Sequence, residues 1–145
     1  MLVSRRSLRR IIAEEINRSL PSCRVSSISV GGLPIQVEVA DTPFLRNRGL
    51  MFRERMDRNH GMLFSFPNES VQSFWMKNTF IPLSIAFIDR RGVITNIERM
   101  RPHDLTSMSS SRRVPYALEM NEGWFDSKGI RPGCEVAGIQ GISLT

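Results

Sequence analysis

The spacing of hydrophobic positions changes after the first 20 residues of the chain. Apolar side chains over residues 7–20 recur every three or four positions, which predicts an amphipathic helix that Pro21 ends. Over residues 35–39 apolar and polar side chains alternate strictly, which is typical of a half-buried strand. We therefore divide the chain into a leading helix with its connector, 1–33, and a single domain, 34–145.

Short apolar runs separated by turn residues make up most of the domain. Beyond the first strand we predict strands over residues 61–66, 73–77, 83–89, 93–97, 114–120 and 135–139, with a candidate strand over 25–30 in the connector. The turn Asp89-Arg90-Arg91-Gly92 joins two of these strands into the clearest hairpin. Residues 99–113 have no apolar period and are predicted to form a long exposed loop.

A short helix is predicted directly after the first strand. The run Asp41-Thr42-Pro43 is typical of a helix start, with Asp41 as the capping side chain, and Gly49 supplies the stop. Leu45 shares a face of this helix with Arg48 and Gly49, so the helix should pack through few residues.

The elements together indicate the fold class. Another short helix is predicted over residues 122–128, strands dominate, and regular alternation of strands with helices is absent. This pattern predicts an α+β, mainly β fold, built as a compact, partly open barrel-like sheet with two or three short helices, plus the N-terminal amphipathic helix.

The positive charge lies mainly in the leading segment. The chain carries a net charge of +6. Residues 1–24 contribute +4 of this charge, because they contain six arginines and two glutamates. The candidates for contact with a partner or an anion are Arg5, Arg6, Arg9 and Arg10. They could bind nucleic acid or a membrane surface. The apolar face of the helix instead favours packing on the domain or on a second copy in a homo-oligomer, and a frayed terminus is a third interpretation.

The expected localisation depends on whether the sequence contains a signal peptide or a membrane-spanning run. Glu14 and Glu15 interrupt the apolar stretch after the first arginines, so it lacks the apolar core of a signal peptide, and no run is long enough to cross a membrane. Cys23 and Cys134 form neither a metal motif nor a disulfide framework and are expected to be free thiols. We therefore expect a cytoplasmic protein.

The segment from Phe74 to Thr79 is the first candidate binding site. Trp75, Lys77 and Asn78 place an indole, an ammonium and an amide close together, which could form a shallow site for a small polar ligand. In the alternative that we favour for this segment, Trp75 packs in the core, Lys77 reaches solvent and Asn78 closes a turn.

Acidic residues add two further candidates for the ligand site. Glu119 lies inside an apolar strand, where it is expected to pair with Lys77 or an arginine in a buried structural ion pair, although such charges also mark functional sites. Asp89 opens a turn. No catalytic residue is assigned, and motifs for a nucleophile, a phosphate loop, a dinucleotide, a cofactor or a metal are missing.

Several segments together resemble the family named domain of unknown function 192, and they occur in the family's order over about residues 35 to 140. They are Val39-Ala40-Asp41-Thr42-Pro43, Arg48-Gly49-Leu50-Met51-Phe52-Arg53, Gly61-Met62-Leu63-Phe64-Ser65-Phe66, Phe74-Trp75-Met76-Lys77-Asn78-Thr79, Ile81-Pro82-Leu83, Phe87-Ile88-Asp89, Tyr116-Ala117-Leu118-Glu119 and Gly129-Ile130. The resemblance implies a small β-rich prokaryotic domain with no assigned activity, in a family whose members often look exported.

The chain departs from the family pattern at two positions. Ser84 and Cys134 stand where the resemblance leads us to expect aspartate. If those acids act chemically in relatives, this protein has lost them; if they only cap turns, a neutral residue is easily accommodated.

Three functional hypotheses remain from the sequence. The first is a non-enzymatic ligand-binding or accessory module with a shallow polar and aromatic site. The second is an enzyme of unassigned class that acts on a polar substrate such as a saccharide and needs two of Asp41, Asp89, Glu119, Lys77 and Asn78 in one cleft. The third is a binder of anionic surfaces or nucleic acid through the arginine-rich helix.

Overall fold

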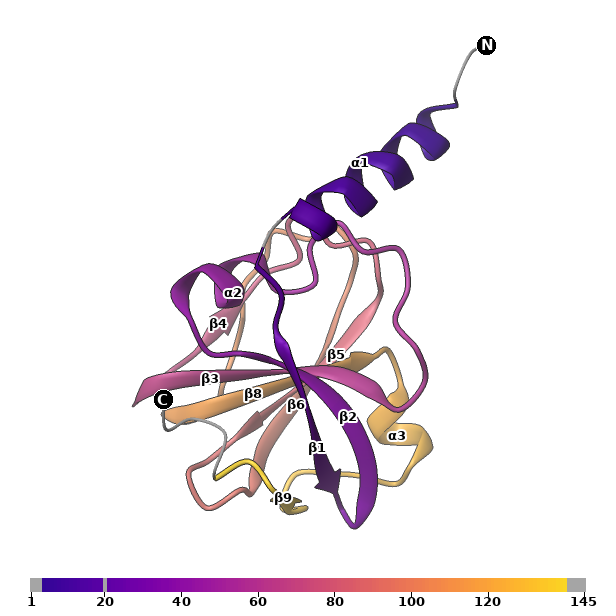
Figure 1. Ribbon diagram of the computed structural model, residues 1–145. Helices are drawn as coiled ribbons and strands as arrows, with labels where there is room; N and C mark the ends of the chain where they lie inside the picture. The colour runs from indigo at the N-terminus through magenta and orange to yellow at the C-terminus, as the bar shows by residue number, and fades with distance from the viewer. Residues whose placement is uncertain (1–3, 20, 141–145) are drawn as a thin grey trace.

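The computed structural model describes residues 4–19 and 21–140, and one curled seven-stranded sheet forms the centre of the described fold (Figure 1). The strands of that sheet are β1 (Arg24–Val30), β2 (Leu33–Ala40), β3 (His60–Ser70), β5 (Leu83–Ile88), β6 (Ile94–Met100), β8 (Val114–Asn121) and β9 (Val136–Ala137). Short strands β4 (Ser73–Phe74) and β7 (Met108–Ser109) pair separately. The helices within the described residues are α1 (Arg5–Ser19), α2 (Pro43–Arg48) and α3 (Trp124–Ser127).

The order of the strands explains the half-barrel shape. The sheet runs β6-β5-β8-β3-β2-β1-β9, and only β2 and β3 pair in parallel. Near β9 the Val136 amide donates to the Gly92 carbonyl at 2.7 Å, and the Ile94 amide donates to the Cys134 carbonyl at 3.0 Å. Because these bonds join β9 to the start of β6, the two ends of the sheet meet there. The predicted mainly β, partly open barrel with an N-terminal helix is confirmed.

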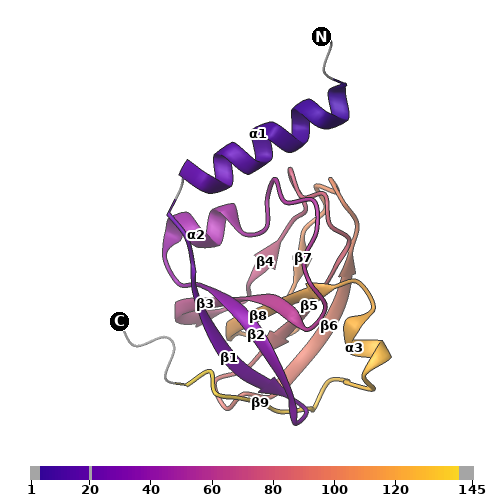
Figure 2. The ribbon, with the colours of Figure 1, turned by 45° about the vertical axis from the view of Figure 1, so that its right-hand side comes forward.

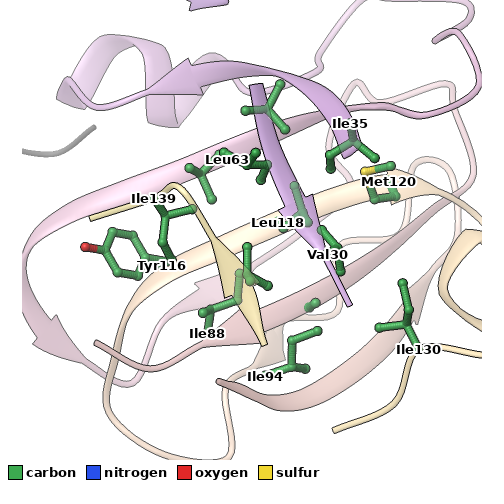
Figure 3. Close-up of a cluster of buried hydrophobic side chains, with 14 of the residues drawn as sticks. Val30, Ile35, Leu63, Ile88, Ile94, Tyr116, Leu118, Met120, Ile130 and Ile139 are labelled. Carbon is green, nitrogen blue, oxygen red and sulfur yellow. The ribbon is translucent and has the colours of Figure 1, made fainter. Parts of the chain in front are cut away.

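Alternation along β2 fills the interior of the curled sheet. Ile35, Val37 and Val39 are buried, whereas Gln36 is exposed and Glu38 is half-buried, as the sequence pattern predicts. Their apolar partners come from several other strands and from the segment after β9, and include Val30, Leu63, Ile88, Ile94, Leu118 and Ile139 (Figure 3). Burial of this interior cluster stabilises the curled sheet through the hydrophobic effect.

A second apolar cluster lies on the other face of β3, β5 and β8. Its members on these three strands are Met62, Phe64, Leu83, Ile85, Phe87, Val114 and Ala117. Leu45 from α2 and Met76 and Ile81 from residues 71–82 cover this face. Figure 2 shows α2, β4 and β7 on this side of the sheet, with α1 beyond α2. The covering segments form the walls of the candidate site described below.

The start of α2 differs from the sequence prediction. Thr42, not Asp41, is the cap, because its hydroxyl accepts a hydrogen bond from the Leu45 amide at 3.2 Å. Asp41 instead accepts a bond from the Arg24 guanidinium at 2.8 Å. The prediction that Asp41 caps the helix is therefore wrong, because the start of β1 lies beside the end of β2 and Arg24 there offers the carboxylate an ionic partner.

Two other segments differ from the sequence-based assignment. The strand predicted over residues 73–77 is limited to the two residues of β4, and the loop predicted over 99–113 contains β7, its partner. The candidate strand in the connector exists as β1, which pairs with β2 along its whole length. Residues 24–30 therefore belong to the sheet.

Candidate functional site

A cavity of about 180 Å³ lies between the second apolar cluster and the segments that cover it. Its floor is formed by β3 and β8, and its walls come from the end of α2 and from residues 73–79. Its lining residues with polar or aromatic side chains are Arg46, Asn47, Arg48, Phe64, Phe66, Ser73, Phe74, Trp75, Thr79 and Glu119. The volume slightly exceeds that of an engineered cavity that admits benzene, about 150 Å³.

Glu119 is the acidic residue of this lining. It lies in the middle of β8, directly opposite Met62 on β3 and Ile85 on β5, and its side chain is 5% exposed. Burial among apolar neighbours raises the pKa of its carboxyl to about 8, because the charged form loses its hydration. The carboxyl therefore carries a proton at neutral pH.

The ion pair expected for Glu119 is absent from the described part of the chain. No basic side chain there lies within 4.0 Å of its carboxylate, and loss of hydration is the cause that raises its pKa. Lys77 instead extends over the Trp75 ring, with its ammonium 5.3 Å from the ring centre. The expectation of a structural ion pair with Lys77 or an arginine is wrong.

Arg48 is the second unusual residue in the cavity wall. It ends α2, its side chain is 8% exposed, and neither Nε nor Nη1 has a hydrogen-bond partner among the described residues. Its guanidinium lies 5.7 Å from the centre of the Phe44 ring and interacts with the Cys23 thiol. Buried guanidinium donors without acceptors are costly, so this arrangement requires an explanation.

The other polar groups of the lining are already engaged within the protein. Arg46 donates from Nη1 to the Ser65 carbonyl at 2.9 Å, and its guanidinium stacks on the Phe66 ring at 5.2 Å. The Thr79 hydroxyl donates to the Lys77 carbonyl at 3.0 Å, and the Ser73 hydroxyl bonds to the Ser109 hydroxyl at 2.8 Å. Two charged residues of the lining differ from these. Arg48 has two donors, Nε and Nη1, without an acceptor among the described residues, and Glu119 has no basic side chain within 4.0 Å.

The residues predicted from the segment 74–79 divide between the cavity and the surface. Trp75 lines the cavity but is 49% exposed, so the interpretation that it packs in the core is wrong. Asn78 has a left-handed backbone, with φ of 53°, and its carbonyl accepts from the Phe52 amide at 2.9 Å. It occupies a turn, as expected, and borders an outer groove with Phe52, Phe80 and His103.

Asp89 lies apart from the cavity lining. Its carboxylate accepts from the amides of Arg91 and Val93 at 2.9 and 3.0 Å, so it closes the turn between β5 and β6. The enzymatic hypothesis requires at least two of its five candidate residues in one cleft, and Glu119 is the one of them that lines this cavity. The geometry gives that hypothesis no paired acid and base.

The arginines of α1 form a separate surface. Arg5, Arg6 and Arg9 line an open groove of about 570 Å³ with Glu54, Phe80 and His103, and Arg10 is exposed. On the same helix the apolar side chains Leu8, Ile11 and Ile12 are each about half exposed, at 46–49%. The helix thus presents basic and apolar side chains to solvent together.

Ser84 and Cys134 both complete turns. The Ser84 hydroxyl accepts a hydrogen bond from the Gly123 amide at 3.1 Å, at the start of α3. The Cys134 sulfur accepts from the Arg131 amide at 3.5 Å. Each side chain meets a backbone donor, a contact that an aspartate carboxylate could also make.

Neither a metal cluster nor a membrane-spanning helix is found in the described residues. No group of three histidine, cysteine, aspartate or glutamate side chains there could hold a metal ion. No described helix is long and apolar enough to cross a bilayer. Both cysteines are free thiols, and burial raises the pKa of Cys23.

The fold and the cavity define the protein as a small half-barrel domain with a cavity lined by polar and aromatic side chains. Its residues 26–138 match the model of DUF192, described as an uncharacterized ACR, and the chain belongs to this family. The match begins within β1, so α1 lies outside it. A search of curated proteins finds no match.

Among the solved structures that share the fold are two proteins with similar sequences. One is a protein of Sinorhizobium meliloti described as a "putative transcription regulator", which is 34% identical, has a TM-score of 0.80, and aligns over 84% of this chain and 99% of its own. The other is a protein of unknown function from Novosphingobium aromaticivorans, 28% identical with a TM-score of 0.75, aligned over 84% of this chain and 95% of its own.

Sequence reasoning missed Arg48 as a candidate site residue. Its signal was present, since Arg48 shares the packing face of α2 with Leu45, and both are buried. An arginine on the packing face of a short helix is unusual enough to single out.

Proposed function

We propose that this protein is a non-enzymatic binding module whose ligand is a small molecule held in the cavity. The observation that carries the proposal is the pair of buried polar groups, Arg48 and Glu119, that line one cavity without an ionic partner. Unpartnered donors on Arg48 and the desolvation of the Glu119 carboxyl both lower stability, and such costs are commonly tolerated where they serve a binding site.

The remaining lining supports binding rather than catalysis. Phe64, Phe74 and Trp75 supply aromatic surface for a ligand's apolar part, while Arg48 and Glu119 supply the few polar groups that fix its orientation. The Sinorhizobium meliloti protein is described as a "putative transcription regulator", and a regulator controlled by a small molecule would need a binding cavity.

Native mass spectrometry of the gently purified full chain tests this proposal. We expect a discrete excess mass over the denatured chain, and we expect Arg48→Met to lose it while Arg112→Met, which changes an exposed arginine, retains it. If the native and denatured masses agree and no small acid, alcohol or sugar of a screening panel raises the melting temperature, the cavity is not a ligand site.

A second function is favoured by the surface of α1, which we propose to bind an anionic lipid bilayer. A bilayer accommodates both kinds of exposed side chain, because Leu8, Ile11 and Ile12 can enter the acyl boundary while the arginines meet phosphate headgroups. Nucleic acid would leave these apolar side chains in water. Self-association of α1 would bring the arginines of two copies together.

Sedimentation with phosphatidylglycerol vesicles tests the lipid proposal. We expect binding that weakens with salt, that is absent with phosphatidylcholine, and that falls at least tenfold in a Leu8→Ser/Ile11→Ser variant. Val71→Ser, which also changes an exposed apolar residue, serves as the control and should bind normally. Binding of duplex DNA that survives the Leu8→Ser/Ile11→Ser change, without vesicle binding, would favour nucleic acid instead.

A further inference from the structure

We propose that the groove between α1 and the domain holds the headgroup of one phosphomonoester lipid, with the chemistry of phosphatidic acid. This inference rests on the proposed binding of α1 to an anionic bilayer, and it names the lipid that the protein recognises there. Three features of the groove support it: its charge, the order of its side chains along α1, and the left-handed residue His103 on its domain side.

The groove carries an excess of positive charge. Arg5, Arg6 and Arg9 line it, and Glu54 is the acidic residue of the same lining. None of these three arginines forms an ion pair with another described residue, so their donors can meet a ligand. Three positive charges and one negative charge complement a phosphomonoester, which carries about −1.5 to −2 at pH 7, better than a phosphodiester or a carboxylate with a single charge.

The groove changes from basic to apolar along α1. Arg5 and Arg9 are four residues apart and Ile12 follows three residues later, so these side chains share one face of the helix. The outer groove, of about 450 Å³, shares Arg9 and Phe80 with the basic groove and adds Ile12 and Phe52. The two grooves therefore adjoin. A ligand whose phosphate lies against Arg5 and Arg9 has its next groups beside Ile12 and Phe52.

This order of side chains favours a lipid over a free phosphate. The rings of Phe52 and Phe80 meet edge to face, with their centres 6.5 Å apart, and offer apolar surface that a small phosphate would leave unused. Leu8 and Ile11 are not part of the lining of either groove, and each is 49% exposed. They remain available to enter the acyl boundary while the groove holds a headgroup.

His103 lies on the domain side of both grooves. Its backbone is left-handed, with φ of 64°, a conformation that is uncommon outside glycine and that clusters at functional sites. The His103 amide donates to the Thr79 carbonyl at 3.2 Å, and its ring centre lies 5.2 Å from that of Phe80. These contacts hold the imidazole beside the groove, where its N–H can donate to a phosphate oxygen.

Sedimentation of the full chain with phosphatidylcholine vesicles that contain either phosphatidic acid or phosphatidylglycerol tests the inference. Phosphatidylglycerol is used at twice the molar share of phosphatidic acid, so that its surface is at least as negative. We expect the phosphatidic acid vesicles to bind about tenfold more tightly, because the groove gains a further charge-assisted hydrogen bond. Equal binding of the two kinds of vesicle would overturn the phosphomonoester site and keep the bilayer proposal.

Arg9→Gln and Arg10→Gln are the matched pair of variants. Each removes one positive charge from an exposed position of α1, but Arg9 lines both grooves and Arg10 lines neither. Arg9→Gln should lose the preference for phosphatidic acid, whereas Arg10→Gln should weaken binding to both kinds of vesicle alike. His103→Asn should reduce the preference, because asparagine accepts the left-handed backbone but lacks the ring. Equal effects of the two arginine variants would place the headgroup outside the groove and overturn the inference.

Titration calorimetry with monomeric dihexanoyl phosphatidic acid separates this inference from the bilayer proposal. We expect binding without vesicles, and binding at least tenfold weaker for glycerophosphate, which lacks the acyl chains. Equal affinity for the two would assign the groove to a free phosphate and overturn the lipid. Vesicle binding by a protein that ignores the soluble lipid would also overturn the inference. Binding of the soluble lipid that Arg9→Gln abolishes, in a protein that does not sediment with vesicles, would support the headgroup site and overturn the bilayer proposal.

Discussion

Replacing Glu119 by glutamine is expected to raise the free energy of unfolding at pH 8 by as much as about 5 kcal/mol, with little change at pH 4.5. The amide has nearly the same shape as the protonated carboxyl and no proton to lose. The difference between the two proteins should therefore grow steadily with pH.

The sign follows from the two pKa values of this carboxyl. In the unfolded chain it ionises near pH 4.5, whereas burial holds the folded pKa at about 8. Between these values only the unfolded state releases the proton, so each pH unit lowers the free energy of unfolding by about 1.4 kcal/mol. Stability that is fully present below pH 4.5 is thus lost as the pH rises to 8, and above that pH the loss is constant.

Urea unfolding at pH 4.5, 6 and 8 measures this effect. Glu135→Gln is the control, because Glu135 is exposed and its neutralisation should leave the pH dependence of the wild type intact. A constant difference between Glu119→Gln and the wild type across the three pH values would show that the carboxyl is ionised in the folded protein, contrary to the prediction.

The cost of Glu119 also bears on why it is present. An apolar residue opposite Met62 and Ile85 would complete the second apolar cluster and stabilise the sheet. Arg48 has a similar cost at the other side of the same cavity. Two destabilising residues that meet at one cavity are more simply explained by a shared ligand than by two independent defects.

Local patterns were sufficient to predict most of the fold. Strict alternation over residues 35–39 identified β2, and the turn at Asp89 identified the hairpin of β5 and β6, because both signals depend on neighbours in sequence. The interpretation that Trp75 packs in the core is wrong, because its exposure depends on β4 ending after two residues and on the cavity beside it. Local alternation carries no information about either.

The candidate site depended on contacts that the sequence does not display. Glu119 was recognisably unusual inside an apolar strand, but its lack of a partner follows from the register of β8 between β3 and β5. Arg48 was on the packing face of α2, yet its isolation depends on Glu38 pairing with Arg53 instead. Both facts require three-dimensional neighbours from distant segments.

Gly61 is a further residue whose role emerges only from the sheet. It lies at the start of β3 opposite Met120, and a Cβ built on it would stand 2.5 Å from the Glu119 carbonyl oxygen. Backbone on the facing strand cannot rotate away from such a contact. The close approach of β3 and β8 beside Glu119 therefore requires glycine at this position.

Gly61→Ala is expected to lower the free energy of unfolding by about 3 kcal/mol, because β3 and β8 must separate to admit the methyl group. Backbone propensity alone predicts the opposite sign, since alanine in a strand is favoured over glycine by roughly 0.5–1 kcal/mol. The forced separation should also disturb Glu119, the next residue to Met120 on β8, and so shift its titration from the wild-type value.

Urea unfolding at pH 6 and a titration of the Glu119 carboxyl followed by NMR measure the two consequences. Gly32→Ala is the control: its φ of +83° strains an alanine, but its Cβ has open space, so it should cost only about 1 kcal/mol and leave the Glu119 pKa unchanged. A Gly61→Ala protein as stable as the wild type would mean that the two strands can separate freely. The tight β3–β8 pairing would then not be what holds the buried carboxyl in place.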